Sequence, residues 1–185
     1  DGAAGGLWQS NVSWGDYDND GDMDIVVGGE RSDNVTRELR LYKNNGNGTI
    51  DPIQIEIAGA GNGMGYGFGG LGWGDFDNDG DIDILASGYA TGNSVELRIY
   101  RNNGNGSIDP VPIEVDGTGN GLRDGGVAWG DFDNDGDSDI LVSGYGSSRQ
   151  LRIYKNNGNG TMDATQIEVD GAGGGLRYGG VAWGD

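Results

Sequence analysis

Hydrophobic residues in this chain occur in short runs separated by stretches rich in Asp, Asn and Gly. In its last third, residues 127–130 and 140–143 are short apolar runs, whereas residues 150–154 and 165–169 alternate apolar and polar side chains. Alternation with a period of two is typical of a strand with one buried face. A short run that is apolar throughout is typical of a strand covered on both faces. The pattern therefore predicts four strands in this stretch.

The four-strand pattern repeats along the chain. A Trp-Gly pair ends the predicted first strand of each unit and recurs every 54 to 59 residues. Residues 1–16 also align without a gap on residues 170–185. We expect the repeated Trp to pack in the core. The predicted repeats are 1–58, 59–116 and 117–170, followed by the first strand of a fourth repeat at 171–185.

A repeat of this length with several short strands is typical of a β-propeller blade or a related array of stacked sheets. We therefore expect an all-β fold of tandem four-stranded antiparallel blades, three complete and one represented by its first strand. Closed propellers have about four to eight blades. The ring is expected to be incomplete without other copies or a longer chain, because the outer sheets would expose apolar surface. The expected partners are other copies of the chain, in a homo-oligomer or a filament.

A nine-residue acidic loop follows each of the first three Trp-Gly pairs and carries Asp at every odd position. Five carboxylates so close together repel one another unless a cation neutralises them. Oxygen ligands without His or Cys suit a hard ion, Ca²⁺ first and Mg²⁺ second. We expect about one Ca²⁺ per repeat, with three complete sites. The candidate metal ligands are Asp16, Asp18, Asp20, Asp22 and Asp24; Asp75, Asp77, Asp79, Asp81 and Asp83; and Asp131, Asp133, Asp135, Asp137 and Asp139.

The order of residues within the loop indicates how it could surround an ion. Positions 1, 3 and 5 lie on one side of an extended segment and could converge. Gly136, at position 6 of the third loop, permits the sharp turn that must follow, and Asp139, at position 9, closes the site. Position 7 is expected to contribute through its backbone carbonyl, as in an EF-hand. An EF-hand itself requires Glu at position 12, where this chain has Val27, Ala86 and Val142.

The pattern DxDxDGxxD, following Trp-Gly and preceding an apolar strand, resembles the FG-GAP/VCBS repeat of integrin-α-like calcium-binding β-propellers. The segment Tyr-Lys-Asn-Asn-Gly-Asn-Gly-Thr at residues 154–161 also resembles that family. The resemblance implies that positions 1, 3, 5 and 9 supply the side-chain ligands. The alternative is an acidic solvated turn, which would not require the same nine-residue pattern three times.

Charge and composition narrow the functional classes. The net charge is −19, and such a surface repels nucleic acid and anionic lipid. The sequence contains no stretch approaching the roughly 18 apolar residues of a membrane span. Acidic loops that bind calcium at high micromolar to millimolar concentrations suit calcium outside the cell. We therefore expect a secreted, extracellular or cell-surface protein without a nucleic-acid partner.

Two functional interpretations follow. The first is a calcium-stabilised extracellular scaffold that is adhesive or fibre-forming. The alternative is a lectin-like or integrin-like module with a carbohydrate or protein ligand, in which Tyr89 and Tyr145 either stack on a sugar or pack on the surface. Catalysis is not expected, because the chain has no His or Cys and its Ser and Lys residues lie in no nucleophile motif.

Overall fold

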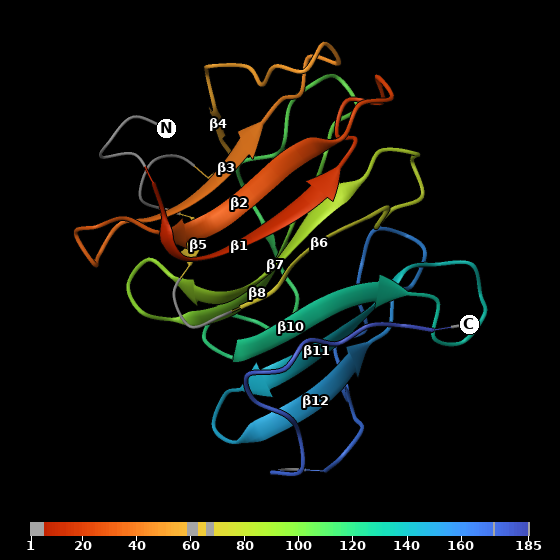
Figure 1. Cartoon of the computed structure of the whole chain (residues 1–185). Helices are drawn as coiled ribbons and strands as arrows, with labels where there is room; N and C mark the ends of the chain where they lie inside the picture. Colours follow the sequence, from red (N-terminus) through yellow and green to blue (C-terminus); the bar gives the residue numbers. More distant parts are fainter. Residues whose placement is uncertain (1–5, 59–62, 66–68, 172, 185) are drawn as a thin grey trace.

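The computed structural model describes residues 6–58, 63–65, 69–171 and 173–184. Within these residues the chain consists of β-strands joined by turns, and the strands form three antiparallel sheets. Figure 1 shows the sheets following one another along the chain without closing into a ring. The described residues include no helix that could cross a membrane. The predicted all-β architecture of tandem antiparallel sheets is therefore confirmed.

Each sheet comes from one repeat; neighbouring strands are consecutive in sequence in the first and third sheets, whereas in the second sheet both β5 and β6 pair with β7. The first sheet contains β1 (Trp8–Gly15), β2 (Asp24–Glu30), β3 (Arg37–Tyr42) and β4 (Ile55–Glu56). The second contains β5 (Met64–Gly65), β6 (Leu71–Gly74), β7 (Asp83–Ala90), β8 (Val95–Tyr100) and β9 (Ile113–Glu114). The third contains β10 (Arg123–Gly130), β11 (Asp139–Tyr145), β12 (Arg149–Tyr154) and β13 (Ile167–Glu168).

The fourth strands are shorter than the alternation of their side chains predicts. Residues 165–169 are predicted as a strand, but β13 covers two residues. In the first two repeats the side chains of Asp51 and Asp109 accept the backbone N–H groups of Ile53 and Val111, both at 2.9 Å. These local hydrogen bonds hold the chain in a turn until just before the strand, as short polar side chains do in Asx turns.

Two hydrophobic clusters lie between the sheets. In the first, Val26 and Leu41 of the first sheet pack with Ile84 and Tyr100 of the second. The second cluster includes Leu85 of the second sheet together with residues of the third sheet. Successive residues of β7 therefore point to opposite neighbours. This arrangement explains why β7, the second strand of its repeat, is apolar on both faces.

The repeated Trp side chains pack against the glycine of the preceding repeat. A Cβ atom on Gly15 would lie 2.6 Å from the ring of Trp73, and Gly74 stands in the same relation to Trp129. Both Trp rings are partly buried against the clusters, which confirms the core prediction for these two residues. The prediction is wrong for Trp14, which is 57 % exposed, because no sheet in the described residues covers its face.

Residues 173–184 differ from the first strand expected there. They run beside β10 (Figure 1), with Trp183 packed over Gly130 and its Nε1 donating to the carbonyl of Ala128 at 3.4 Å. No β-strand forms in this segment. In each complete repeat the first strand is held by a ladder to the second strand, as β1 is to β2. The 185 residues do not include a second strand for this segment.

Candidate metal centres

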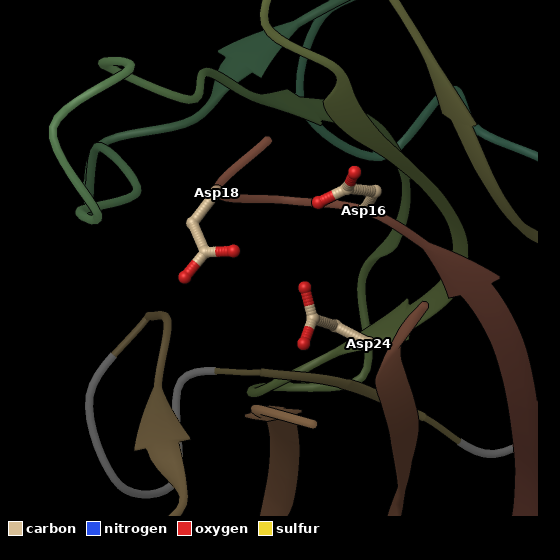
Figure 2. Close-up of side chains that lie close together, drawn as sticks. All are labelled: Asp16, Asp18 and Asp24. Carbon is tan, nitrogen blue, oxygen red and sulfur yellow. The ribbon is translucent and has the colours of Figure 1, made fainter. Parts of the chain in front are cut away.

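The structure brings three carboxylates of each acidic loop together. In the first loop, Asp16, Asp18 and Asp24 each offer an oxygen, and these atoms lie within 4.8 Å of one another. Figure 2 shows their carboxylates gathered around a common space. Loop positions 1, 3 and 9 are therefore the close group. The equivalent groups are Asp75, Asp77 and Asp83, and Asp131, Asp133 and Asp139.

The ends of the loop are joined by the sheet itself. Gly15 at the end of β1 pairs with Asp24 at the start of β2, so positions 1 and 9 begin close together. The carboxylate of Asp16 then accepts the backbone N–H groups of Asp20 and Gly21, at 3.1 and 2.9 Å. Gly21 has a φ of +92°, a conformation that glycine adopts without steric cost. The turn predicted at position 6 is confirmed.

The aspartate at position 9 is buried and fixed by two backbone groups. Asp24 accepts the N–H of Tyr17 at 3.0 Å and the N–H of Asn44 at 2.7 Å. Tyr17 belongs to the loop, whereas Asn44 follows the third strand. Position 9 therefore ties the loop to the end of the third strand, and Asp83 and Asp139 do the same in the other repeats.

Burial makes the charge at position 9 costly. Desolvation raises the pKa of Asp24 and Asp139, and it raises the pKa of Asp83 from 3.8 to about 7. The carboxylates at positions 3 and 5 raise these pKa values further, while the two backbone N–H groups oppose the shift. The site therefore favours a proton or a cation beside this carboxylate.

A basic residue after each third strand contacts position 3, and in the first and third repeats it also lies near position 5. The Nζ atom of Lys43 pairs with Asp18 and lies 3.1 Å from Asp20. The pKa of Asp20 is lowered first by the backbone N–H of Asp22 and then by this ammonium group. Arg101 pairs with Asp77, and Lys155 with Asp133, in the other repeats. Sequence reasoning missed these cations, although a basic residue follows the third-strand Tyr in every repeat.

The donor set fits a hard cation. The Oδ1 atoms of Asp18 and Asp77 are buried and have no hydrogen-bond partner. An unpaired buried carboxylate oxygen is costly unless a cation satisfies it. All the converging atoms are carboxylate oxygens, the ligands that Ca²⁺ and Mg²⁺ prefer. Positions 1, 3 and 9 would hold such an ion in each of the three repeats.

Positions 5 and 7 lie outside the close group. Asn19 and Gly21 both have positive φ, 56° and 92°, so the extended path ends after position 3. Positions 1, 3 and 5 were expected to converge. Positions 1 and 3 do so, whereas position 5 is not in the close group. The carboxylates at position 5 accept the N–H at position 7, at 3.0 Å, in all three loops: Asp20 to Asp22, Asp79 to Asp81, and Asp135 to Asp137.

The side chains at position 7 make a different contact, between repeats. Asp81 accepts a hydrogen bond from Asn19 of the preceding loop at 2.6 Å, and Asp137 accepts one from Asn78 at 2.6 Å. These donors were not predicted from the sequence, although Asn occupies position 4 of all three loops. That position 7 donates its carbonyl to an ion stays a prediction.

The second and third repeats place Tyr89 and Tyr145 at the ends of β7 and β11 remote from the loops. The guanidinium of Arg123 lies 5.3 Å from the centre of the Tyr89 ring and 5.0 Å from that of Tyr145. Arg37 also stacks on Tyr89, and Arg177 on Tyr145. These cation–π contacts use the ring faces that a sugar would need. They favour the packing interpretation over carbohydrate stacking.

A known family of repeats matches this chain three times, once from each acidic loop. A profile described as an FG-GAP-like repeat matches residues 16–86, 75–142 and 131–185. Each match begins at position 1 of an acidic loop and runs through the next loop or to the end of the chain. Together the matches cover well over half of the chain. No curated protein matches the sequence.

Proposed function

Because the chain belongs to the FG-GAP-like repeat family, we propose that it is a calcium-stabilised extracellular repeat scaffold, adhesive or fibre-forming. One observation carries this proposal: the same three carboxylates meet in every repeat, with the buried one tied to two other parts of the blade. An ion at that place would join the loop to the sheet. Its role would be structural.

The energetic support comes from the cost of the loops without a cation. Three carboxylates within 4.8 Å repel one another, and one of them is buried. A ligand that binds only the folded state adds about 2.7 kcal/mol per site when its concentration is about 100 times Kd. Three such sites would contribute a large share of the stability of a domain, which is about 5–15 kcal/mol.

The extracellular assignment rests on calcium supply. Loops of this type in extracellular modules bind with dissociation constants of about 10⁻⁴–10⁻³ M, which calcium outside cells can saturate. The basic residue beside the loop also favours weak calcium binding, because its positive charge repels an incoming cation. The proposal gives the chain no catalytic role, because its clustered carboxylates serve the loops.

The test compares thermal unfolding in millimolar CaCl₂, in MgCl₂ and in EGTA, together with calorimetric calcium titration. The variant Asp18→Asn/Asp77→Asn/Asp133→Asn removes one charge per loop at position 3. The matched control, Asp51→Asn/Asp109→Asn/Asp163→Asn, makes the same charge change outside the loops. We expect calcium to raise the melting temperature of the natural chain and the control, but not of the loop variant. An unchanged melting temperature in EGTA for the natural chain would refute the proposal.

A further inference from the structure

The outer face of the first sheet carries apolar residues whose counterparts in the second and third sheets pack between the sheets. We call this surface the open face. It presents a shallow groove of about 390 Å³. Val12 is 61 % exposed and Ile50 is 40 % exposed. The open face consists of Val12, Trp14, Ile25, Val27, Tyr42 and Ile50.

Two interfaces within the chain show what fits such a face. The matching residues of the second sheet pack against the first sheet, and those of the third pack against the second. Ile108, for example, is the counterpart of Ile50 and is only 8 % exposed. The open face is therefore equivalent to a blade interface, and no sheet within the described residues covers it. Its counterparts are Leu71, Trp73, Ile84, Ala86, Tyr100 and Ile108 in the second sheet, and Val127, Trp129, Ile140, Val142, Tyr154 and Met162 in the third.

Polar contacts across the internal interfaces have complementary halves at the two ends of the array. Asn102 donates to the carbonyl of Tyr17 at 2.6 Å, and Asn156 donates to that of Phe76 at 2.7 Å. Continuing this pattern, Asn44 of the first repeat would donate to the carbonyl of Phe132 in the third. Asn134 of the third loop would likewise donate to Asp22 of the first, as Asn19 donates to Asp81.

Residues 173–184, the C-terminal segment, occupy the place of a following blade on the last sheet. The Trp183 ring lies over Gly130 and 6.3 Å from the Phe132 ring, as Trp129 lies over Gly74 and 6.4 Å from Phe76. No strand ladder holds this segment. Its described polar contacts to the sheet are few and include an ion pair of 2.8 Å between Arg177 and Asp124.

We propose that the open face binds the last sheet of a second copy of this chain, and that the C-terminal segment competes for the same place. In the complex, Trp14 of one copy would replace Trp183 over Gly130 of the other. Because the two contacting surfaces differ, repetition gives either a closed ring of copies or a filament. The segment is tethered to its site, so its high effective concentration keeps association weak until it is displaced.

This inference deepens the proposed scaffold role but uses surfaces separate from the calcium loops. The experiment is sedimentation velocity of the full chain over a range of concentrations in millimolar CaCl₂. Trp183→Ser weakens the competing segment, and we expect it to lower the concentration needed for association by about tenfold or more. Adding Trp14→Ser or Val12→Ser should restore the monomer. Val111→Ser is the matched control for Val12→Ser, because Val111 is 73 % exposed and lies outside the open face.

A second measurement does not depend on how well Trp183→Ser folds. A synthetic peptide of residues 170–185 should occupy the last sheet and dissolve assemblies of the natural chain formed at high concentration. Assemblies that persist with saturating peptide, or that are indifferent to Trp14→Ser, would overturn the inference. A chain that is monomeric at every concentration would also overturn it and assign the open face to another occupant. Normal calcium binding by such a monomer would leave the proposed function intact, whereas association without calcium binding would refute only that function.

Discussion

The side-chain amide of Asn19 donates a hydrogen bond to Oδ1 of Asp81 at 2.6 Å, and these two residues, 62 positions apart in the sequence, belong to successive acidic loops. Asn78 and Asp137 make the same contact between the second and third loops. A carboxylate that belongs to one loop is thus positioned by the loop before it. The repeats are coupled through polar contacts as well as through their hydrophobic clusters.

Replacing Asn19 tests this coupling. Asn19→Gly removes the amide while keeping a residue that tolerates a φ of 56°. We expect a loss of about 1 kcal/mol in the free energy of unfolding, because Asp81 loses a donor at a partly solvated site. Urea unfolding measures the loss, and Asn134→Gly is the control because no complete loop follows it in the 185 residues. Equal effects of the two variants would show that the hydrogen bond does not contribute.

Trp14 and Trp73 occupy the same position in their repeats but differ in environment. Trp73 packs over Gly15 and against the first hydrophobic cluster, whereas Trp14 is 57 % exposed. Trp73→Ala should therefore cost about 3 kcal/mol or more, because it leaves a cavity. Trp14→Ala should cost less than about 1 kcal/mol. Urea unfolding at a concentration where the chain is monomeric compares them, and similar losses would contradict the packing described.

The stability of the calcium-free protein should fall as pH rises from 5 to 8. Burial raises the pKa of Asp83 from 3.8 to about 7, so the folded state holds this proton more tightly than the unfolded state. The resulting stabilisation is complete below the unfolded pKa and is lost as pH rises through about 7. Asp24 and Asp139 shift in the same direction. Calcium should flatten or reverse the trend, because it stabilises the carboxylate form.

Scanning calorimetry in EGTA and in CaCl₂ at four pH values between 5 and 8 measures this dependence. Asp83→Asn cannot titrate and should reduce the slope in EGTA. Asp109→Asn controls for the change in net charge. A melting temperature in EGTA that rises steadily from pH 5 to 8 would contradict the raised pKa of Asp83 in the folded state.

Lys155 should weaken calcium binding in the third loop. Its ammonium group pairs with Asp133 and lies 4.0 Å from Asp135, beside the carboxylates that would hold the ion. Removing one charge at this range changes the interaction by about 1 kcal/mol, or about fivefold in affinity. Lys155→Gln should therefore bind calcium more tightly.

Calorimetric titration measures this affinity in a background of Asp18→Asn and Asp77→Asn, which leaves the third loop as the functional site. Arg149→Gln makes the same change of charge at the far end of β12, where Arg149 is exposed, and should have little effect. Weaker binding by Lys155→Gln would show that the lysine supports the site instead of opposing the ion.

Local sequence was sufficient to predict the units and much of each loop. The apolar second strands, the glycine at position 6 and the aspartates at positions 1, 3 and 9 depend on residues within a few positions of one another. Alternation failed as a guide beyond position 3, because Asn19 and Gly21 leave the extended conformation there. Position 5 consequently turns to the backbone of its own loop, and position 7 of the second loop contacts the preceding repeat.

The sequence by itself determined the repeat, its strand pattern and the residues that could bind a hard cation, because these follow from short-range periodicity and composition. Only the tertiary structure decided which copies of a repeated residue are buried. Trp14 and Trp73 have nearly the same neighbours in sequence. The preceding sheet covers Trp73, whereas no sheet in the described residues covers Trp14. The same holds for the contacts of Asn19 and Lys43, whose partners are distant along the chain. Such contacts depend on how whole sheets stack, which local pattern does not encode.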